Sequence, residues 1–237
     1  LLCDSWYRQD TVKAKEYLTK GKLLAAGNAY LNSIYFYFLA NLSYVNSIPT
    51  AEYYYMQGDS ALQNFNTPRA NAYKAKIWHN YGVMQQLKDD NKKFADILLN
   101  KSIPYAQLSG DSVYLGKCFF DLGLTFKNMG QKDKVEEYCN TAIKILTNAK
   151  APYDQLVAVY IMAAENYCLL SKLPQAKVML DTAKSILQLF PQSRYNADYY
   201  ASESMYYNIK ELYPQALESV NKGVELANSL NLSYNAN

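Results

Sequence analysis

The chain has 237 residues, half of them apolar and 24 of them tyrosine, and its net charge is +3. Charged residues make up 19% of the chain, below the roughly 25% of an average soluble domain, and no long basic run is present. This composition argues against a nucleic-acid-binding surface and against a polybasic membrane-binding patch.

The predicted elements start with a single helix over residues 11–27, and five pairs of helices follow it. The pairs cover residues 28–66, 69–109, 111–149, 152–190 and 195–230. The most apolar segment, residues 34–42, lies in the first pair and is interpreted as a buried helix, because a membrane span needs about 20 apolar residues. No strand-like alternation is sustained, so the sequence predicts an all-α protein with about eleven helices.

Helix ends are marked by proline and glycine. In the third pair, the first helix is expected over residues 112–129 and the second over residues 132–148. Pro174 and Pro214 stand in the first turn of the second helix of their pairs, where a proline leaves no hydrogen bond unmade. Pro104 falls inside the second helix of the second pair, so we expect a kink or an early end there.

Small residues recur at a fixed spacing. In the first helix of each pair a small residue follows an aromatic residue by four positions, and it returns about every 41 residues, at Ala40, Gly82, Gly123, Ala164 and Ser204. Glycine inside a helix costs roughly 1 kcal/mol relative to alanine, so its return indicates a close crossing of neighbouring helices. We therefore expect Gly123→Leu to overpack such a crossing. Internal repetition at this period is typical of a solenoid.

The third pair reads FFDLGLTFKNMGQKDKVEEYCNTAIKI and resembles the tetratricopeptide repeat (TPR), a helix–turn–helix unit with an aromatic residue, Leu-Gly, a tyrosine and an alanine in corresponding places. The fourth and fifth pairs resemble it as well, and the first two depart from it at Ser43, Gln85 and Tyr54. The resemblance implies a right-handed α-α superhelix, a TPR-like solenoid, in one array over residues 1–237. Repeats longer than the family's usual 34 residues look like those of bacterial regulatory proteins, in which the array senses a peptide or a partner protein.

No constellation of catalytic or metal-binding residues stands out. His79 is the single histidine, so a multi-histidine metal site is impossible and a Ser-His-Asp arrangement has one candidate base. Glycine-rich phosphate-binding motifs are absent, and the four cysteines lack the spacing of a metal site. For Cys3 an ordinary thiol is favoured over a lipid-attachment site, and Cys139 is expected to be a buried thiol. We expect no enzyme, no cofactor and no metal.

In the tetratricopeptide family the first helices of the pairs line a concave groove. With the recurring small residue on the packed side, the groove side receives a set of residues that could hold a ligand: Tyr37, Asn41, Lys76, His79, Lys117, Phe120, Leu124, Lys127, Glu165 and Asn208. The same rule selects Ala158, Ile161, Asp198 and Ala201.

The groove residues indicate the kind of ligand. Lys76, Lys117 and Lys127 favour an extended peptide with an acidic group or a free carboxylate, while solvated lysines with no ligand are the alternative. Asn41 matches the place of a peptide-binding asparagine in the chaperone-tail binders of the family. Tyr37 stands where those proteins have lysine, so their carboxylate clamp is incomplete in this chain.

The sequence thus predicts a non-catalytic domain that binds a protein or peptide, as the sensor or interaction region of a signalling or transcription-regulating protein. The alternatives are a structural scaffold or assembly factor, and a carbohydrate-binding surface suggested by the many tyrosines and asparagines. Exposed tyrosines could instead pack against further repeats or a second chain, which leaves a homo-oligomer open. The chain starts without methionine and stops directly after a helix, so we expect a piece of a longer protein, and the sequence does not choose between cytoplasm and periplasm.

Overall fold

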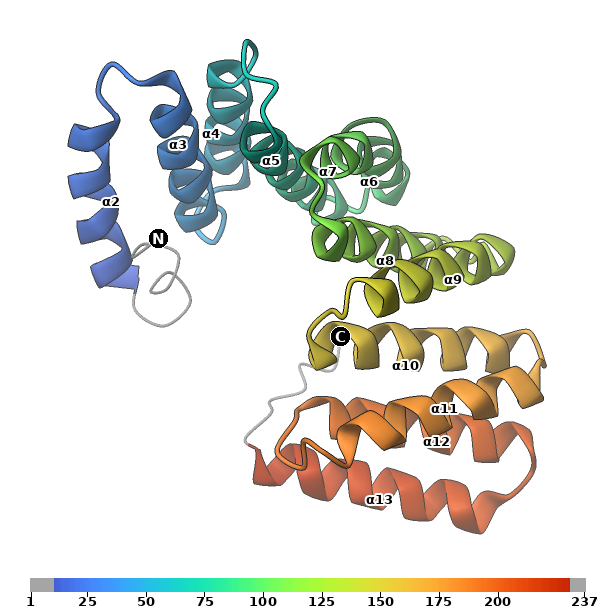
Figure 1. Ribbon diagram of the computed structural model, residues 1–237. Coiled ribbons are helices and arrows are strands. Elements are labelled where there is room, and N and C mark those ends of the chain that lie inside the picture. Colours follow the sequence, from blue (N-terminus) through green and yellow to red (C-terminus); the bar gives the residue numbers. More distant parts are fainter. Residues whose placement is uncertain (1–10, 231–237) are drawn as a thin grey trace. The chain divides into compact units, whose positions relative to one another are not determined.

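The computed structural model of the chain describes residues 11–230, and every regular element in that range is a helix (Figure 1). The α-helices are α2 (Thr11–Ala25), α3 (Ala29–Ser43), α4 (Ile48–Ala61), α5 (Pro68–Gln86), α6 (Asn91–Ile97), α7 (Ile103–Ser109), α8 (Ser112–Asn128), α9 (Lys132–Asn148), α10 (Tyr153–Leu169), α11 (Leu173–Leu187), α12 (Tyr195–Ile209) and α13 (Tyr213–Ser229). A π-helical turn, Leu98–Ser102, joins α6 to α7. The described residues thus contain the predicted single helix followed by five helix pairs, and Cys3 lies outside them.

The helix ends follow the local signals in the sequence. The helices expected over residues 112–129 and 132–148 are α8 and α9, which agree with the expected bounds to within one residue. Pro174 and Pro214 lie in the first turns of α11 and α13, as expected. None of the helices within residues 11–230 is long and apolar enough to span a membrane.

Pro104 disturbs its helix without ending it. The π-helical turn Leu98–Ser102 lies directly before α7, where Pro104 is in the first turn. A proline cannot donate a backbone hydrogen bond, and its ring clashes with the carbonyl four residues earlier, here that of Asn100. A wider π turn relieves this clash while the helix continues. The expected early end is therefore wrong, and the expected local disturbance is confirmed.

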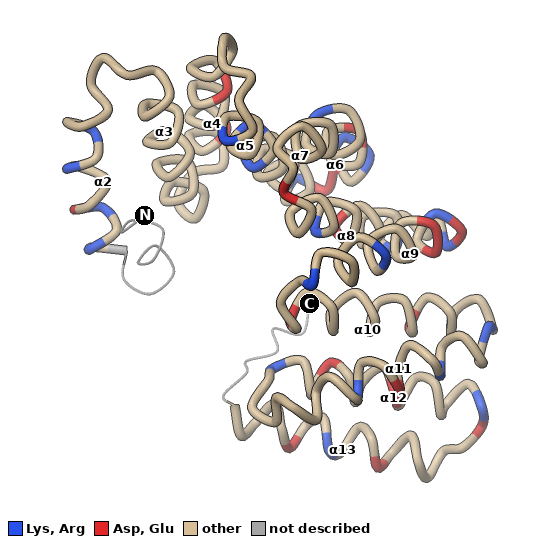
Figure 2. The backbone as a smooth tube through the Cα atoms, viewed as in Figure 1, with Lys and Arg blue, Asp and Glu red and all other residues tan. Residues whose placement is uncertain are grey.

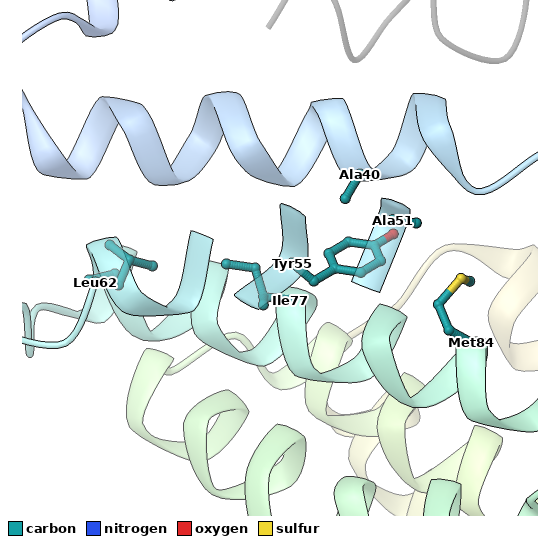
Figure 3. Close-up of a cluster of buried hydrophobic side chains, with 7 residues drawn as sticks. Ala40, Ala51, Tyr55, Leu62, Ile77 and Met84 are labelled. Atoms are coloured by element: carbon teal, nitrogen blue, oxygen red, sulfur yellow. The ribbon is translucent and has the colours of Figure 1, made fainter. Parts of the chain in front are cut away.

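The chain divides into two compact units, residues 1–118 and 119–237, with the boundary inside α8. In the first unit, α3, α4 and α5 pack around a cluster of buried side chains (Figure 3): Ala40, Ala51, Tyr55, Leu62, Ala70, Ile77 and Met84. Helix α3 contains no charged residue (Figure 2), which suits a helix that packs against α2, α4 and α5. The expected single array over residues 1–237 stays a prediction.

In the second unit, each pair of helices runs back and forth through a tight turn (Figure 1). The buried faces of α9 and α11 repeat the same spacing with mostly small side chains: Val135, Cys139, Ala142 and Leu146 in α9, and Ala176, Leu180, Ala183 and Leu187 in α11. This spacing of three and four residues places the side chains on one stripe of each helix.

The recurring small residues mark close helix crossings. A Cβ atom added at Gly123 would lie 3.2 Å from Cε of Met162 and 3.6 Å from Sγ of Cys139, on the two helices that follow α8. At Gly82 the same atom would lie 2.5 Å from the ring of Phe94. The interpretation of these glycines as packing devices is confirmed. Ser204, at the equivalent place in α12, is only partly buried.

Candidate functional site

A cavity of about 710 Å³ lies in the second unit, between the first helices of its pairs and the last helix. We call it the C-terminal cavity. Helices α8, α10, α12 and α13 line it. Its lining residues are Phe120, Leu124, Lys127, Ala158, Ile161, Met162, Glu165, Tyr195, Ala197, Asp198, Ala201, Val220, Gly223, Val224, Ala227 and Asn228.

Helical spacing explains why these residues meet. Phe120, Leu124 and Lys127 are four and three residues apart on α8, so their side chains share one face. Glu165 lies seven residues after Ala158 on the equivalent face of α10. The structure therefore brings four of the predicted site residues, Phe120, Leu124, Lys127 and Glu165, into one cavity. Ala158, Ile161, Asp198 and Ala201, selected by the same rule, also line it.

The C-terminal cavity contains one basic and two acidic side chains. Lys127 forms an ion pair with Glu165, whose other oxygen accepts a hydrogen bond from the hydroxyl of Ser202 at 2.6 Å. Asp198 adds a second acidic side chain to the lining. One lysine is thus accompanied by two carboxylates, and the lysine predicted to hold an acidic group of the ligand, Lys127, is already paired. This pairing joins residues 38 positions apart in the sequence.

Most of the lining is apolar, with few polar groups between large hydrophobic side chains. Ile161 and Met162 are buried, while Val220 and Val224 on α13 are 43% and 53% exposed. Sequence reasoning did not select any residue of α13, because it placed the groove on the first helices of the pairs. The apolar spacing of Val220 and Val224 was the available signal.

In the first unit, three predicted residues gather around one tyrosine that the prediction missed. The ammonium of Lys76 lies 5.8 Å from the ring centre of Tyr114, and that of Lys117 lies 6.0 Å from it. Nδ1 of His79 is 2.9 Å from the hydroxyl oxygen of Tyr114. These distances fit cation–π contacts for the lysines and a hydrogen bond for the histidine.

A second tyrosine extends this group. The ring of Tyr73 lies 5.9 Å from that of Tyr37 and 5.6 Å from the ammonium of Lys76. Tyr73, Tyr114 and Tyr195 each stand nine residues before a recurring small residue, so the repeat itself was the signal that could have identified them. Lys76 and Lys117 are partly buried against these rings, and His79 is buried.

Two of the predicted groove residues, Asn41 and His79, are buried and do not face a groove. Asn41 is 6% exposed, and its amide oxygen accepts hydrogen bonds from the hydroxyl of Tyr55 at 2.7 Å and from the amide of Asn80 at 3.0 Å. It therefore joins α3, α4 and α5 instead of facing a groove. Asn41 is buried because α3 is apolar on most sides and packs against α2, α4 and α5.

Asn208, another predicted groove residue, is exposed on α12 and does not line the C-terminal cavity.

The remaining candidate chemistry is that of the thiols. Burial raises the pKa of Cys139 to about 12, and burial together with Glu165 raises that of Cys168 to about 11. Such thiols stay protonated and are poor nucleophiles. Cys139 is thus a buried thiol, as expected. Within residues 11–230, no three side chains of the metal-binding types gather at one place.

Comparisons with known proteins identify the fold. No family model matches the sequence, and no curated protein matches it. Among solved structures, the chain is similar to BtubC (BKLC) from P. vanneervenii, with a TM-score of 0.77, 15% identity and coverage of 97% of this chain and 94% of that one. It is also similar to a Rap protein complexed with competence and sporulation factor, with a TM-score of 0.68, 12% identity and coverage of 97% and 74%.

A third similar structure is YrrB, a TPR protein with an unusual peptide-binding site, with a TM-score of 0.54, 19% identity and coverage of 87% of this chain and 91% of that one. At these identities the similarity concerns the fold. The chain has a TPR-like solenoid fold, and the all-α fold predicted from the sequence is confirmed.

Proposed function

We propose that this chain is a peptide- or protein-binding TPR-like domain, and that the C-terminal cavity holds the ligand's apolar side chains. The observation that carries the proposal is the cavity itself, whose volume of about 710 Å³ falls within the range of ligand pockets. Its walls combine apolar side chains with a few fixed polar groups, the pattern that gives affinity and orientation. The sensor role in a signalling or transcription-regulating protein belongs to the same proposal.

The charges of the cavity define the ligand more closely. Glu165 is already paired with Lys127, and Asp198 adds a further negative charge. An acidic group of a ligand placed here would meet two carboxylates and one neutralised lysine. The C-terminal cavity therefore suits apolar side chains next to neutral or basic groups. An acidic group fits better beside Lys76 and Lys117 in the first unit.

Two of the similar structures support peptide binding. The Rap protein was solved in complex with competence and sporulation factor, and YrrB is described as having a peptide-binding site. These statements concern those proteins, and they show that TPR-like folds of this kind can hold such ligands.

The test uses one exposed residue inside the cavity and one outside it on the same helix. Peptides are selected from a random displayed library on the wild-type chain, and their dissociation constants are measured by fluorescence polarisation. Ala201→Arg places a large charged side chain in the cavity without removing core contacts, since Ala201 is exposed. We expect Ala201→Arg to weaken binding by at least about tenfold. Asn208→Arg, outside the cavity, should leave binding unchanged.

Two results would contradict the proposal. One is a set of selected peptides that bind Ala201→Arg as tightly as the wild type, which would move the site elsewhere. The other is a library from which nothing is enriched. The sensor role is tested separately by solution scattering with the selected peptide, because a sensor needs different affinities for two states. An unchanged scattering profile at saturation supports a scaffold instead.

A further inference from the structure

Met162 is the one long and flexible side chain among the buried residues that line the C-terminal cavity. The other buried residues of the lining are branched or small: Ile161, Ala197, Gly223 and Ala227. Met162 is 4% exposed, and its unbranched thioether can adapt to irregular spaces. The wall that Met162 forms is therefore the part of the cavity that moves most easily.

The end of this side chain lies against a gap in the neighbouring helix. A Cβ atom added at Gly123 of α8 would lie 3.2 Å from Cε of Met162, closer than the roughly 3.5–4.0 Å at which carbon atoms pack best. Sγ of Cys139 on α9 borders the same gap, 3.6 Å from that Cβ position. The absence of a side chain at Gly123 thus leaves the room in which the methyl group of Met162 sits.

The open space beside Met162 is the C-terminal cavity, which it lines. Cys139 is buried, and so are Leu122 and Ala163, the chain neighbours of Gly123 and Met162. A close-packed interior has no room for a displaced methyl group. A methyl group that cannot sit against Gly123 therefore moves toward the cavity and makes it shallower.

The corresponding place on α12 is fixed by a polar contact instead. Ser202 has the place in α12 that Met162 has in α10, two residues before the recurring small residue. Its hydroxyl donates a hydrogen bond of 2.6 Å to Glu165. The thioether of Met162 has no hydrogen atom to donate, so packing alone holds it. Of these two equivalent side chains, only Met162 can adjust to what enters the cavity.

We propose that Met162, seated against Gly123, sets the depth of the C-terminal cavity and selects ligands that insert one large apolar side chain, such as an indole or phenyl ring. With its methyl group against Gly123 the cavity is at its deepest, and the sulfur of Met162 can contact an aromatic ring favourably. This inference rests on the proposed function for its site, and it adds the class of side chain that the site selects.

Methyl NMR of the full chain, with carbon-13 in the methionine methyl groups, tests the role of Met162. The chain has six methionines, and Met162→Leu identifies the signal of Met162 by its absence. The test ligands are N-acetyltryptophanamide, with a large side chain, and N-acetylvalinamide, with a small one, at up to about 20 mM. We expect the tryptophan amide to shift the Met162 signal and to bind at least about tenfold more tightly than the valine amide.

Gly123→Ala tests the gap. Its nearest neighbour is the end of a flexible side chain, so the fold should be kept, which a thermal melt checks. The added methyl group displaces that of Met162 toward the cavity. We expect the dissociation constant of the tryptophan amide to rise by about threefold to tenfold, and that of the valine amide to change by less than about twofold.

A double variant tests whether the effect passes through Met162. Met162→Leu nearly conserves the side-chain volume but ends one atom earlier, so it does not reach the gap. In this background Gly123→Ala should leave the binding of the tryptophan amide unchanged. Such non-additivity is expected only of residues that are in contact. The control is Met205→Leu, the same substitution on α12 outside the cavity, which should change the binding of neither amide.

Three results would overturn the inference. They are a Met162 signal that neither amide shifts, a Gly123→Ala variant that binds the tryptophan amide as tightly as the wild type, and an effect of Gly123→Ala that persists in Met162→Leu. Ala201→Arg separates this inference from the proposed function. If Ala201→Arg abolishes binding while Gly123→Ala changes nothing, only the inference fails, whereas binding that Ala201→Arg leaves intact removes the cavity as the site.

Discussion

In the two units, different kinds of side chain pack between the helices. In the first unit, α3, α4 and α5 are joined by a large buried aromatic residue, Tyr55, and by the hydrogen bonds that meet at Asn41. In the second unit, small and aliphatic residues such as Ala142 and Ala183 form the contacts between helices. The first unit therefore has a tyrosine–asparagine contact at the centre of its core, where the stripes of α9 and α11 have small and aliphatic side chains.

The two units also differ in the hydrogen bonds at the starts of their helices. In the first unit the side chains of Asn28, Ser47, Thr67 and Asp90 accept hydrogen bonds from the backbone at the starts of α3 to α6. In α9 to α13 the N-cap residue makes no such side-chain bond, although Ser193 accepts one from the N–H of Tyr195 at the start of α12. Left-handed residues close turns in both units, at Gly27, Asp89 and Gly110 in the first and at Gly130, Lys150, Ser171 and Glu211 in the second.

Backbone hydrogen bonds close the turns after several helices. After α10, the N–H of Lys172 donates to the carbonyl of Tyr167 at 2.8 Å, and the N–H of Leu212 makes the same bond to Tyr207 after α12. Such bonds satisfy helix-end carbonyls whatever the side chains are. The first unit makes the same bond after α5, from the N–H of Asp90 to the carbonyl of Gln85 at 3.0 Å, so the units differ in how their helices start and not in how these turns close.

The largest expected effect compares two buried asparagines, one from each unit. Asn41→Leu in the first unit removes the acceptor of Tyr55 and Asn80, and we expect a loss of about 3 kcal/mol in the free energy of unfolding. Asn166→Leu in the second unit removes one bond of 3.3 Å to the carbonyl of Lys132 and an oxygen that has no hydrogen-bond partner among the described residues. Its expected loss is below about 1 kcal/mol. Urea unfolding measures both, and equal losses would contradict the contrast between the units.

The next effect compares two glycines at the same place in the repeat. A Cβ at Gly82 would lie 2.5 Å from the ring of Phe94, which is 2% exposed and has no room to move. We expect Gly82→Ala to cost about 2 kcal/mol. At Gly123 the nearest atom is the flexible end of Met162, at 3.2 Å, and alanine favours the helix by up to about 1 kcal/mol.

Gly123→Ala should therefore be close to neutral, and the bulkier Gly123→Leu should cost about 1–3 kcal/mol. Thermal melts of the three variants rank them. A Gly123→Leu variant as stable as the wild type would show that α8 can shift away from α9 and α10 at no cost.

The smallest expected effect is a pH dependence from the first unit. Burial raises the pKa of Asp59, whose carboxylate accepts a hydrogen bond from the indole N–H of Trp78 at 2.9 Å. The folded state then holds its proton at a pH where the unfolded state has released it, so stability falls as the pH rises from the unfolded to the folded pKa. Asp59→Asn keeps an acceptor for Trp78 and lacks this loss.

The stability of Asp59→Asn relative to the wild type should thus increase as the pH rises above the usual range of an aspartate pKa. Urea unfolding at several pH values measures this difference. A difference that stays constant with pH, or that decreases, would show that Asp59 does not lose stability by ionising in the folded protein.

The sequence by itself determined the helices and their pairing. It also determined which side of α8, α10 and α12 lines the C-terminal cavity. Prolines, small residues and apolar spacing act within a few residues of chain, which is why α8 and α9 fall where they were expected. Helical geometry also relates Phe120 and Leu124 to Gly123 without knowledge of any other helix. Their meeting in one cavity follows from the same rule applied to α10 and α12.

Only the tertiary structure decided how these faces are used. Lys127 is neutralised by Glu165 on another helix, and Asn41 is buried by Tyr55 and Asn80, so neither outcome could be read from local spacing. Val220 on α13 stands at the position in the repeat that Leu180 has on α11. Leu180 is buried, whereas Val220 is exposed because no described helix packs on it. Burial and pairing depend on which helices meet in space, whereas the helices themselves depend on neighbours along the chain.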